Sequence, residues 1–414
     1  MMINNSESSI DCHYKEIKMA TETLKHFQNM LLKCATISKT EIEEALNELF
    51  SFLKEINIPA DFMIYESFIR LLAHISITKN NKDNQPIFIS IIDELIHNYS
   101  LKSSFHSSTL FYIFKKNPVI LLYLYEQKII EIQEIRNEIL TSYNIDTKLF
   151  IFFLPEIQKN CRDLYQSKAK LFRIKMEISK YYSKDKKKSF IHDRKECHSN
   201  EEIARIIRND DIESFIEAIS RSYDSDLNAK VHNSYFEIND EINNRDEGLS
   251  FLEYSMAFGS INIFKYLIMN KAVCFHYSIK YAFIGGNNEI IHILEEKSQN
   301  KFNLECLITA IKYYHEDIIN YLITMYDIEI PISKLIKYSY DKFNFQMANM
   351  ALVTFIENKT DNENDNNILK MNEFQNIIEE YTFHTKSLKI YLLYYYCIQH
   401  PKIDVYRFDR VLIL

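Results

Sequence analysis

Apolar, small and glycine positions recur with the same spacing in two stretches of the chain. Residues 250–267 superimpose on residues 277–294 at a shift of 27 positions, which places Gly259 on Gly286. Apolar residues at helical spacing precede and follow each glycine, and glycine tolerates the left-handed conformation that ends a helix. Each stretch therefore predicts a helix, a tight turn and a second helix.

Related stretches extend this pattern in both directions. A third copy runs one residue out of phase, with Ala310 in the small position that Ser255 and Ala282 hold, and Tyr314 in the turn position. An earlier copy has Arg208 in the glycine position. Repetition with a period of roughly 20–50 residues predicts a solenoid, in which neighbouring copies stack. The clearest copies are expected at 202–221, 249–272, 276–297 and 304–325, with weaker copies near 332–358 and 373–399.

The rest of the chain also has helical periodicity. Residues 1–182 are read as a series of amphipathic helices, which form either a separate helical domain or decayed repeats that cap the solenoid. A basic and polar linker at 183–199 then leads to the solenoid at 200–414. Within the solenoid, an insertion rich in Asn, Asp and Glu separates Lys230 from Asp246. The expected fold is all-α, an amino-terminal helical domain followed by a helical-repeat solenoid.

The repeated unit resembles the ankyrin repeat, whose consensus runs Thr-Pro-Leu-His-x-Ala, then Gly, then Val-Val-x-Leu-Leu. Residues 250–255 match the first block with the threonine, proline and histidine replaced. The spacing of 27 to 28 residues is shorter than the usual 33 or so. With the long insertion and the helical first half, the chain more closely resembles ankyrin-containing protist proteins with an uncharacterised domain. The resemblance implies a binding surface, and it transfers no specific activity.

Composition and net charge limit the classes of partner and the cellular compartment that we expect. The net charge of −8 disfavours nucleic acid as the main partner. The 7 cysteines are odd in number and never form a CxxC pair, which indicates reduced thiols. No signal peptide and no apolar stretch of membrane-spanning length is recognised, so a soluble cytoplasmic protein is expected. The run from Lys184 to Lys188 leaves open nuclear import or contact with an anionic surface.

Candidate chemistry is sparse. No phosphate-binding, nucleophile or zinc-protease motif occurs, and we expect no catalytic residue, cofactor or metal. Residues 361–372 have alternating acids but lack the glycine and the final glutamate of a calcium loop. His192, Cys197 and His198 lack a second ligand pair for zinc, so they are read as part of a solvated linker.

The function that these patterns favour is non-enzymatic protein–protein interaction on the concave face of the solenoid. The alternative is an enzyme or enzyme subunit with an unrecognised active site in the amino-terminal half. A third option is a regulatory protein that the basic run carries to the nucleus or to an anionic surface. The partner and the oligomeric state stay open. Seven residues on first helices and connecting fingers are the protein-binding candidates: Asp246, Glu247, Ala257, Phe258, His276, Lys312 and Tyr313.

Overall fold

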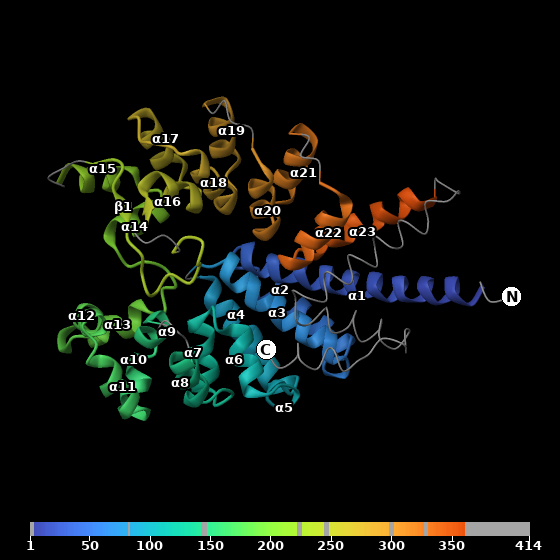
Figure 1. The fold of residues 1–414 in the computed structure, drawn as a ribbon, viewed down its shortest axis with the longest axis horizontal. Coiled ribbons are helices and arrows are strands. Elements are labelled where there is room, and N and C mark those ends of the chain that lie inside the picture. The colour runs from blue at the N-terminus through green and yellow to red at the C-terminus, as the bar shows by residue number, and fades with distance from the viewer. Residues whose placement is uncertain are drawn as a thin grey trace. The chain divides into compact units, whose positions relative to one another are not determined.

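The fold is an all-α helical-repeat architecture, as the sequence predicted (Figure 1). The computed structural model describes residues 4–81, 83–141, 147–221, 226–243, 248–297, 302–326 and 330–360. These residues form 23 α-helices and one two-stranded antiparallel sheet. The weaker copy expected near 373–399, and the acidic stretch at 361–372, lie outside the described residues.

Contacts divide the chain into two compact units. The described residues within 1–71 and 329–414 form one, here called the terminal unit, and those within 72–328 form the other, the central unit. This division does not follow the boundary that the sequence predicted at 183–199. One border instead falls within helix α3 (Phe62–Thr78).

The terminal unit joins the two ends of the described chain. It contains α1 (Asn4–Thr36), α2 (Ile42–Glu55), η1 (Ile58–Ala60), the first part of α3, α22 (Ile332–Asp341) and α23 (Phe345–Thr360). Helix α1 packs on α2 and on α23. The side chain of Gln28 accepts a hydrogen bond from the Phe345 backbone at 2.6 Å, at the start of α23. Buried Asn344 caps the same helix by accepting from Met347 N at 3.0 Å. Helices α22 and α23 lie where the sequence suggested a weaker copy near 332–358, and Met347 and Ala351 on α23 are buried.

Short helices make up the first part of the central unit. The apolar runs at 118–125 and 149–155 become buried short helices here, α7 (Pro118–Glu126), α9 (Thr147–Phe152) and α10 (Leu154–Asn160). Within the described residues, no helix combines the length and the apolar character that crossing a bilayer requires. The helices are α4 (Asn84–Asn98), α5 (Leu101–Ser104), α6 (Ser107–Phe114), α7 (Pro118–Glu126), α8 (Ile132–Thr141), α9 (Thr147–Phe152), α10 (Leu154–Asn160), α11 (Arg162–Ala169), α12 (Phe172–Tyr181), η2 (Lys184–Lys186) and α13 (Lys187–Asp193).

Four helix pairs follow. They are α14 (Glu202–Arg208) with α15 (Ile212–Arg221), α16 (Phe251–Phe258) with α17 (Ile261–Met269), α18 (Lys280–Gly285) with α19 (Asn288–Lys297), and α20 (Leu304–Lys312) with α21 (Glu316–Met325). The first helices α14, α16, α18 and α20 pack in sequence order, and so do the second helices α15, α17 and α19 (Figure 1). Gly259 and Gly286 end their helices in the left-handed conformation, with φ of 69° and 66°. The residues at the shared small position, Ser255, Ala282 and Ala310, are all buried on first helices that pack against one another.

A hydrogen bond ties each pair to the one before it. In each of these pairs, one residue of the turn adopts the left-handed conformation. The next residue forms a hydrogen bond to a carbonyl oxygen near the end of the first helix of the preceding pair. Ser260 Oγ donates to Ile207 O at 2.6 Å, and Asn287 Nδ2 donates to Gly259 O at 3.1 Å. His315 Nε2 lies 3.1 Å from Ile284 O. Because these bonds recur, neighbouring pairs are joined by polar contacts as well as by apolar packing.

The turn of the first copy differs from the sequence prediction. Arg208 is the last residue of α14, and the left-handed residue is Asp210, with φ of 52°. Aspartate occupies this conformation more readily than most residues with a side chain. Asp210 also accepts hydrogen bonds from Asn262 N and Ile263 N, both at 3.0 Å, and so caps α17 of the next pair.

The segment at 183–199 is folded rather than a solvated linker. Phe190 and Arg194 are buried, and the Phe190 ring meets the Phe236 ring edge-on at 5.5 Å. Arg194 makes two hydrogen bonds of 2.9 Å to the Glu156 carboxylate and a third, of 3.0 Å, to Phe152 O. A bidentate arginine pair neutralises the buried charge, which is why this polar segment can pack inside the unit.

Candidate interaction site

The long insertion of the repeat region folds into the central unit. Strand β1 (Lys230–Val231) pairs with β2 (Leu249–Ser250), so that Lys230 lies opposite Ser250. Residues 232–243, here called the insertion, follow β1. Although the sequence is rich in Asn, Asp and Glu, the central residues from Phe236 to Asn239 are all buried.

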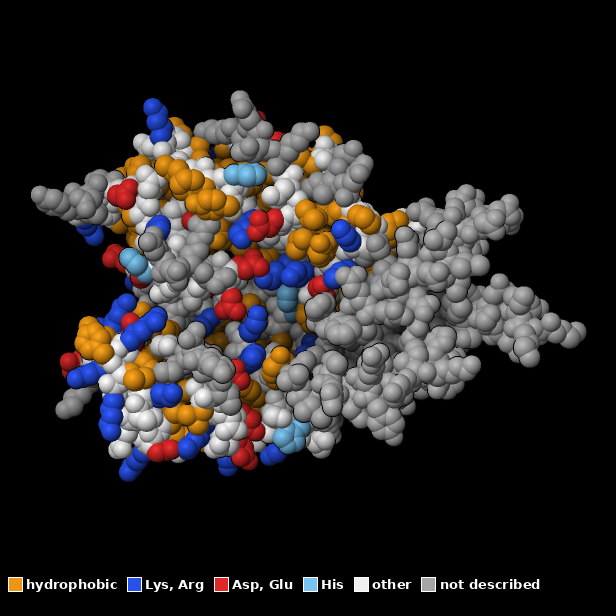
Figure 2. All heavy atoms as spheres, viewed as in Figure 1, with side chains coloured by type: hydrophobic (Ala, Val, Ile, Leu, Met, Phe, Trp, Pro, Cys, Tyr) orange, Lys and Arg blue, Asp and Glu red, His pale blue; other side chains and the backbone are white. Residues whose placement is uncertain are grey.

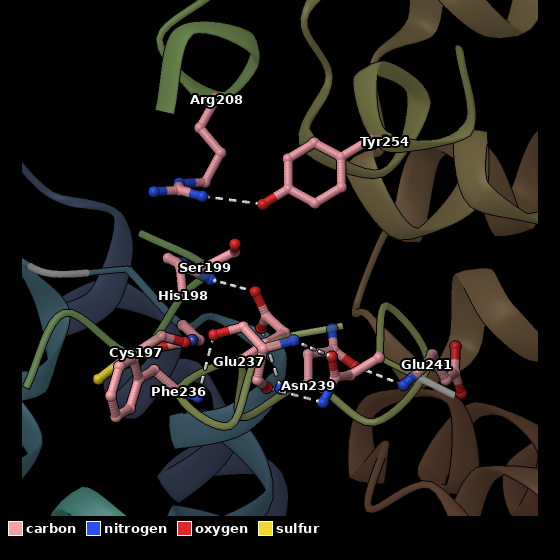
Figure 3. Close-up of polar contacts among 12 residues, drawn as sticks. Cys197, His198, Ser199, Arg208, Phe236, Glu237, Asn239, Glu241 and Tyr254 are labelled. Atoms are coloured by element: carbon pink, nitrogen blue, oxygen red, sulfur yellow. Dashed lines mark hydrogen bonds and ion pairs between the residues drawn. The ribbon is translucent and has the colours of Figure 1, made fainter. Parts of the chain in front are cut away.

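Buried polar groups of the insertion find partners within the central unit (Figure 3). His198 Nδ1 and Glu237 Oε2 are 3.0 Å apart, and both side chains are almost fully buried. The second oxygen of Glu237 accepts from Asn239 N at 3.1 Å. Ile238 N donates to Cys197 O at 3.3 Å, and Asn80 Nδ2 donates to the same carbonyl at 3.0 Å. Paired in this way, the polar groups avoid the cost of burial without a partner.

Two of the predicted binding residues are engaged by this insertion. Tyr313 is only 1% exposed, and its hydroxyl accepts from Asn239 Nδ2 at 2.9 Å. Lys312 forms an ion pair with Glu241. Burial holds the pKa of the Tyr313 phenol well above its ordinary value. An intramolecular segment therefore already occupies these two positions.

The carboxyl end of α20 receives further polar contacts from residues that follow α3. Lys79 Nζ donates to Tyr313 O at 2.7 Å. Burial lowers the pKa of Lys79 to about 8. Burial, with the positive charge of Lys79 nearby, also lowers the pKa of His315 to about 4. A cation at a helix carboxyl terminus is favourable, so Lys79 has a structural role at this position.

The structure places the other predicted residues in different surroundings. Ala257 is buried, and Phe258 is half-buried, with its ring 4.7 Å from that of Tyr254 and 5.2 Å from that of His198. Arg208 donates to the Tyr254 hydroxyl at 2.8 Å (Figure 3). His276 is exposed. Asp246 and Glu247 lie outside the described residues.

An exposed segment between α17 and α18 carries three large apolar side chains. Five consecutive exposed residues, Val273 to Tyr277, form this segment, here called the finger, which overlaps the first residues of η3 (His276–Ser278). The rings of Phe275 and Tyr277 stack with centroids 5.2 Å apart and planes 8° apart. They are 51% and 54% exposed. Of this segment, the sequence pattern predicts only His276 as a binding residue. Apolar residues at alternate positions, 273, 275 and 277, were the signal that could have revealed the others.

Polar contacts at the base of the finger fix its position. Val273 N donates to Asn228 Oδ1 at 2.8 Å, which links the finger to the segment that precedes β1. Buried Ser278 donates to Glu253 Oε1 at 2.5 Å. Glu253 also completes a capping box with Ser250 at the start of α16. The exposed rings are therefore held between two anchored ends.

The residues considered for zinc do not share one environment. Cys197 is fully buried, and burial raises the pKa of its thiol. His198 is paired with Glu237, whereas the His192 side chain is exposed. Among the described residues, no three or more His, Cys, Asp or Glu side chains form a group that could hold a metal ion.

A shallow depression in the first part of the central unit has a volume of about 200 Å³. Charged side chains line it, and they are paired with one another. Lys148 and Lys116 lie 3.2 and 3.7 Å from the Asp240 carboxylate, and Lys115 lies 3.5 Å from Glu138. The paired charges indicate a surface ion-pair network rather than a cleft with converging free groups.

Comparison with known proteins gives one match. Residues 273–352 match a family described as a domain of unknown function (DUF3447). The match begins at the finger and covers about a fifth of the chain. No curated protein and no solved structure matches the chain significantly.

Proposed function

We propose that this chain is a protein-binding module of the ankyrin type and that a protein partner contacts the finger. Three features support the ankyrin assignment: stacked helix pairs, left-handed glycines at Gly259 and Gly286, and connecting segments that project between pairs. The matched domain of unknown function often occurs in ankyrin-repeat proteins. Repeat arrays of this kind offer extended surfaces rather than enclosed pockets.

The stacked, half-exposed rings of Phe275 and Tyr277 are the observation that carries this proposal. Aromatic side chains contribute strongly to binding when a partner buries them. Because the rings already stack and the finger is anchored at both ends, little conformational freedom is lost on binding. Val273 and His276 extend the same exposed segment on either side of Phe275.

The proposed contact surface keeps one of the sequence-predicted residues and sets others aside. His276 belongs to the finger. Tyr313 and Ala257 are buried, so a partner gains almost no contact area from them. Lys312 is already paired with Glu241 of the insertion.

The test is affinity capture with the full chain as bait, followed by mass spectrometry of proteins from the source cells. The double variant Phe275→Ala/Tyr277→Ala removes the stacked rings, and capture of the partner should fall at least tenfold. The matched control Phe62→Ala/Tyr112→Ala removes two other rings that are each 49% exposed, and it should capture the partner as wild type does.

Circular dichroism separates loss of binding from loss of folding, because all four substituted side chains are about half exposed. Both double variants should keep the wild-type helical signal. Equal recovery of the same proteins by the finger variant and by wild type would refute the finger as the binding surface.

A further inference from the structure

Helix α12 exposes one apolar stripe while burying another. Ile174 is buried against the unit, and Ile178 is half-buried. On the opposite side of the helix, Phe172 is 79% exposed and Met176 is 56% exposed. These two residues are four positions apart, so they are neighbours on one helical face. Two exposed apolar side chains of this size have no role in the internal packing of α12.

Basic residues surround this apolar stripe. Residues 168–188 contain nine Lys and Arg against only Glu177 and Asp185, in a chain whose net charge is −8. Figure 2 shows Lys and Arg side chains around an apolar patch at the lower left, where Figure 1 labels α11–α13. Two further exposed apolar residues, Leu171 and Ile191, lie on the adjoining segments. We call this surface the basic face: Lys170, Arg173, Lys175, Lys180, Lys186, Lys187 and Lys188, with Leu171, Phe172, Met176 and Ile191.

Some cations of the basic face have contacts within the fold: Lys180 and Lys187 lie over the Tyr181 and Tyr182 rings, and Lys186 donates to Lys180 O at 2.9 Å. Four of the lysines have no acidic partner in the described part of the chain. Among the described residues, no carboxylate lies within ion-pair distance of Lys170, Lys175, Lys187 or Lys188. Lys187 and Lys188 lie in the first turn of α13, where a positive charge opposes the helix dipole. Their charge therefore does not stabilise this helix.

We propose that the basic face docks peripherally on an anionic phospholipid bilayer. Lysine and arginine side chains attract the negative surface of such a bilayer, while exposed apolar side chains on the same face enter the boundary between headgroups and acyl chains. The chemical type of the exposed apolar side chains favours lipid over nucleic acid as the partner of this surface. Nucleic-acid surfaces combine basic residues with several aromatic stacking platforms. Here, three of the four exposed apolar residues are aliphatic or thioether side chains, namely Leu171, Met176 and Ile191.

Vesicle co-sedimentation of the full chain tests this proposal. With vesicles of phosphatidylcholine containing about one third phosphatidylserine, the chain should sediment with the lipid. With phosphatidylcholine alone it should stay in solution. Lys186→Glu/Lys187→Glu/Lys188→Glu should weaken binding to the anionic vesicles more than tenfold. The control Lys54→Glu/Lys102→Glu/Lys128→Glu makes the same charge change at exposed lysines elsewhere and should bind as wild type does.

A second variant tests the apolar contribution separately from charge. Phe172→Ser/Met176→Ser keeps every charge and alters only exposed side chains, and it should weaken binding at least threefold while the helical signal is unchanged. Wild-type binding by this variant, or an equal loss in the control lysine variant, would overturn the proposal. Binding of a single-stranded RNA oligonucleotide with no binding to anionic vesicles would also overturn it and would favour nucleic acid.

Discussion

The helix pairs at 251–325 and the insertion at 232–243 both contribute buried residues to the central unit, but by different means. The pairs bury apolar stripes and small residues such as Ala282 and Ala310, and each pair repeats the contacts of its neighbour. The insertion has no regular helix, and its buried carboxylate and amide groups each find a specific partner, such as His198 for Glu237. A periodic region can therefore exchange one apolar residue for another, whereas the insertion depends on individual polar pairs.

The largest expected effect comes from placing a charge in the periodic region. Ala310→Glu puts a carboxylate at a fully buried position on α20, against α18, and an unpaired buried charge costs several kcal/mol. Urea denaturation should show a loss of about 4 kcal/mol or more, and Ala282→Glu should behave alike. Lys280→Ala is the control. It removes a partly exposed pair with Glu305, so stability should change by less than about 1 kcal/mol. Equal stability of all three variants would mean that the small positions do not face neighbouring helices.

The second prediction breaks the central polar pair of the insertion. Glu237→Ala leaves buried His198 and the Asn239 amide without their acceptor, and it should cost about 3 kcal/mol in urea denaturation. Glu237→Gln keeps a carbonyl oxygen that can accept from Asn239 N, so about half of the loss should be recovered. A loss below about 0.5 kcal/mol for the alanine variant would show that the insertion is open to water.

This contrast also explains which features the sequence could predict. The turns at Gly259 and Gly286 were predictable because glycine favours the left-handed conformation that they adopt. Asp210 was missed because a residue with a side chain seldom takes that role, and the Ser250–Glu253 capping box was not recognised although its spacing is present in the sequence.

Burial of the insertion could not be read from the sequence, because its partners lie far away along the chain. His198 and Glu237 are 39 residues apart, and Asn239 and Tyr313 are 74 residues apart. Polar residues such as these are usually solvated, and only the folded structure shows their hydrogen-bond partners. Tyr313 was predicted as a binding residue but is buried, because Asn239 of the distant insertion bonds to its hydroxyl. His276, which was predicted alongside it, is exposed.

The third prediction concerns His315, a histidine of the periodic region whose pKa is lowered by burial. His315 has a pKa of about 4 in the folded chain, below its ordinary 6.5, because burial and Lys79 disfavour the charged ring. The unfolded state therefore binds more protons between pH 6.5 and 4, and stability falls as the pH decreases through this window. His315→Gln can still donate to Ile284 O but does not titrate. Relative to this variant, wild type should lose up to about 3 kcal/mol between pH 7 and pH 4. Parallel pH profiles for the two proteins would contradict the assignment.

The smallest expected effect comes from removing one hydrogen bond between the insertion and the periodic region. Tyr313→Phe removes the hydroxyl that accepts from Asn239 while keeping the ring, and it should cost about 1 kcal/mol in urea denaturation. Tyr277→Phe makes the same change on a ring that is more than half exposed, and it should be nearly neutral. Equal stability of the two variants would indicate that the insertion does not bond to α20.

Hydrogen–deuterium exchange followed by mass spectrometry compares the two regions most directly. The amides of the insertion donate to Ser234, Cys197, Glu237 and Asn239. Peptides covering 234–243 should therefore exchange nearly as slowly as peptides from α16, and Glu237→Ala should accelerate exchange in the insertion more than in α16. Exchange of residues 234–243 at the rate of unprotected amides, with α16 still protected, would contradict burial of the insertion.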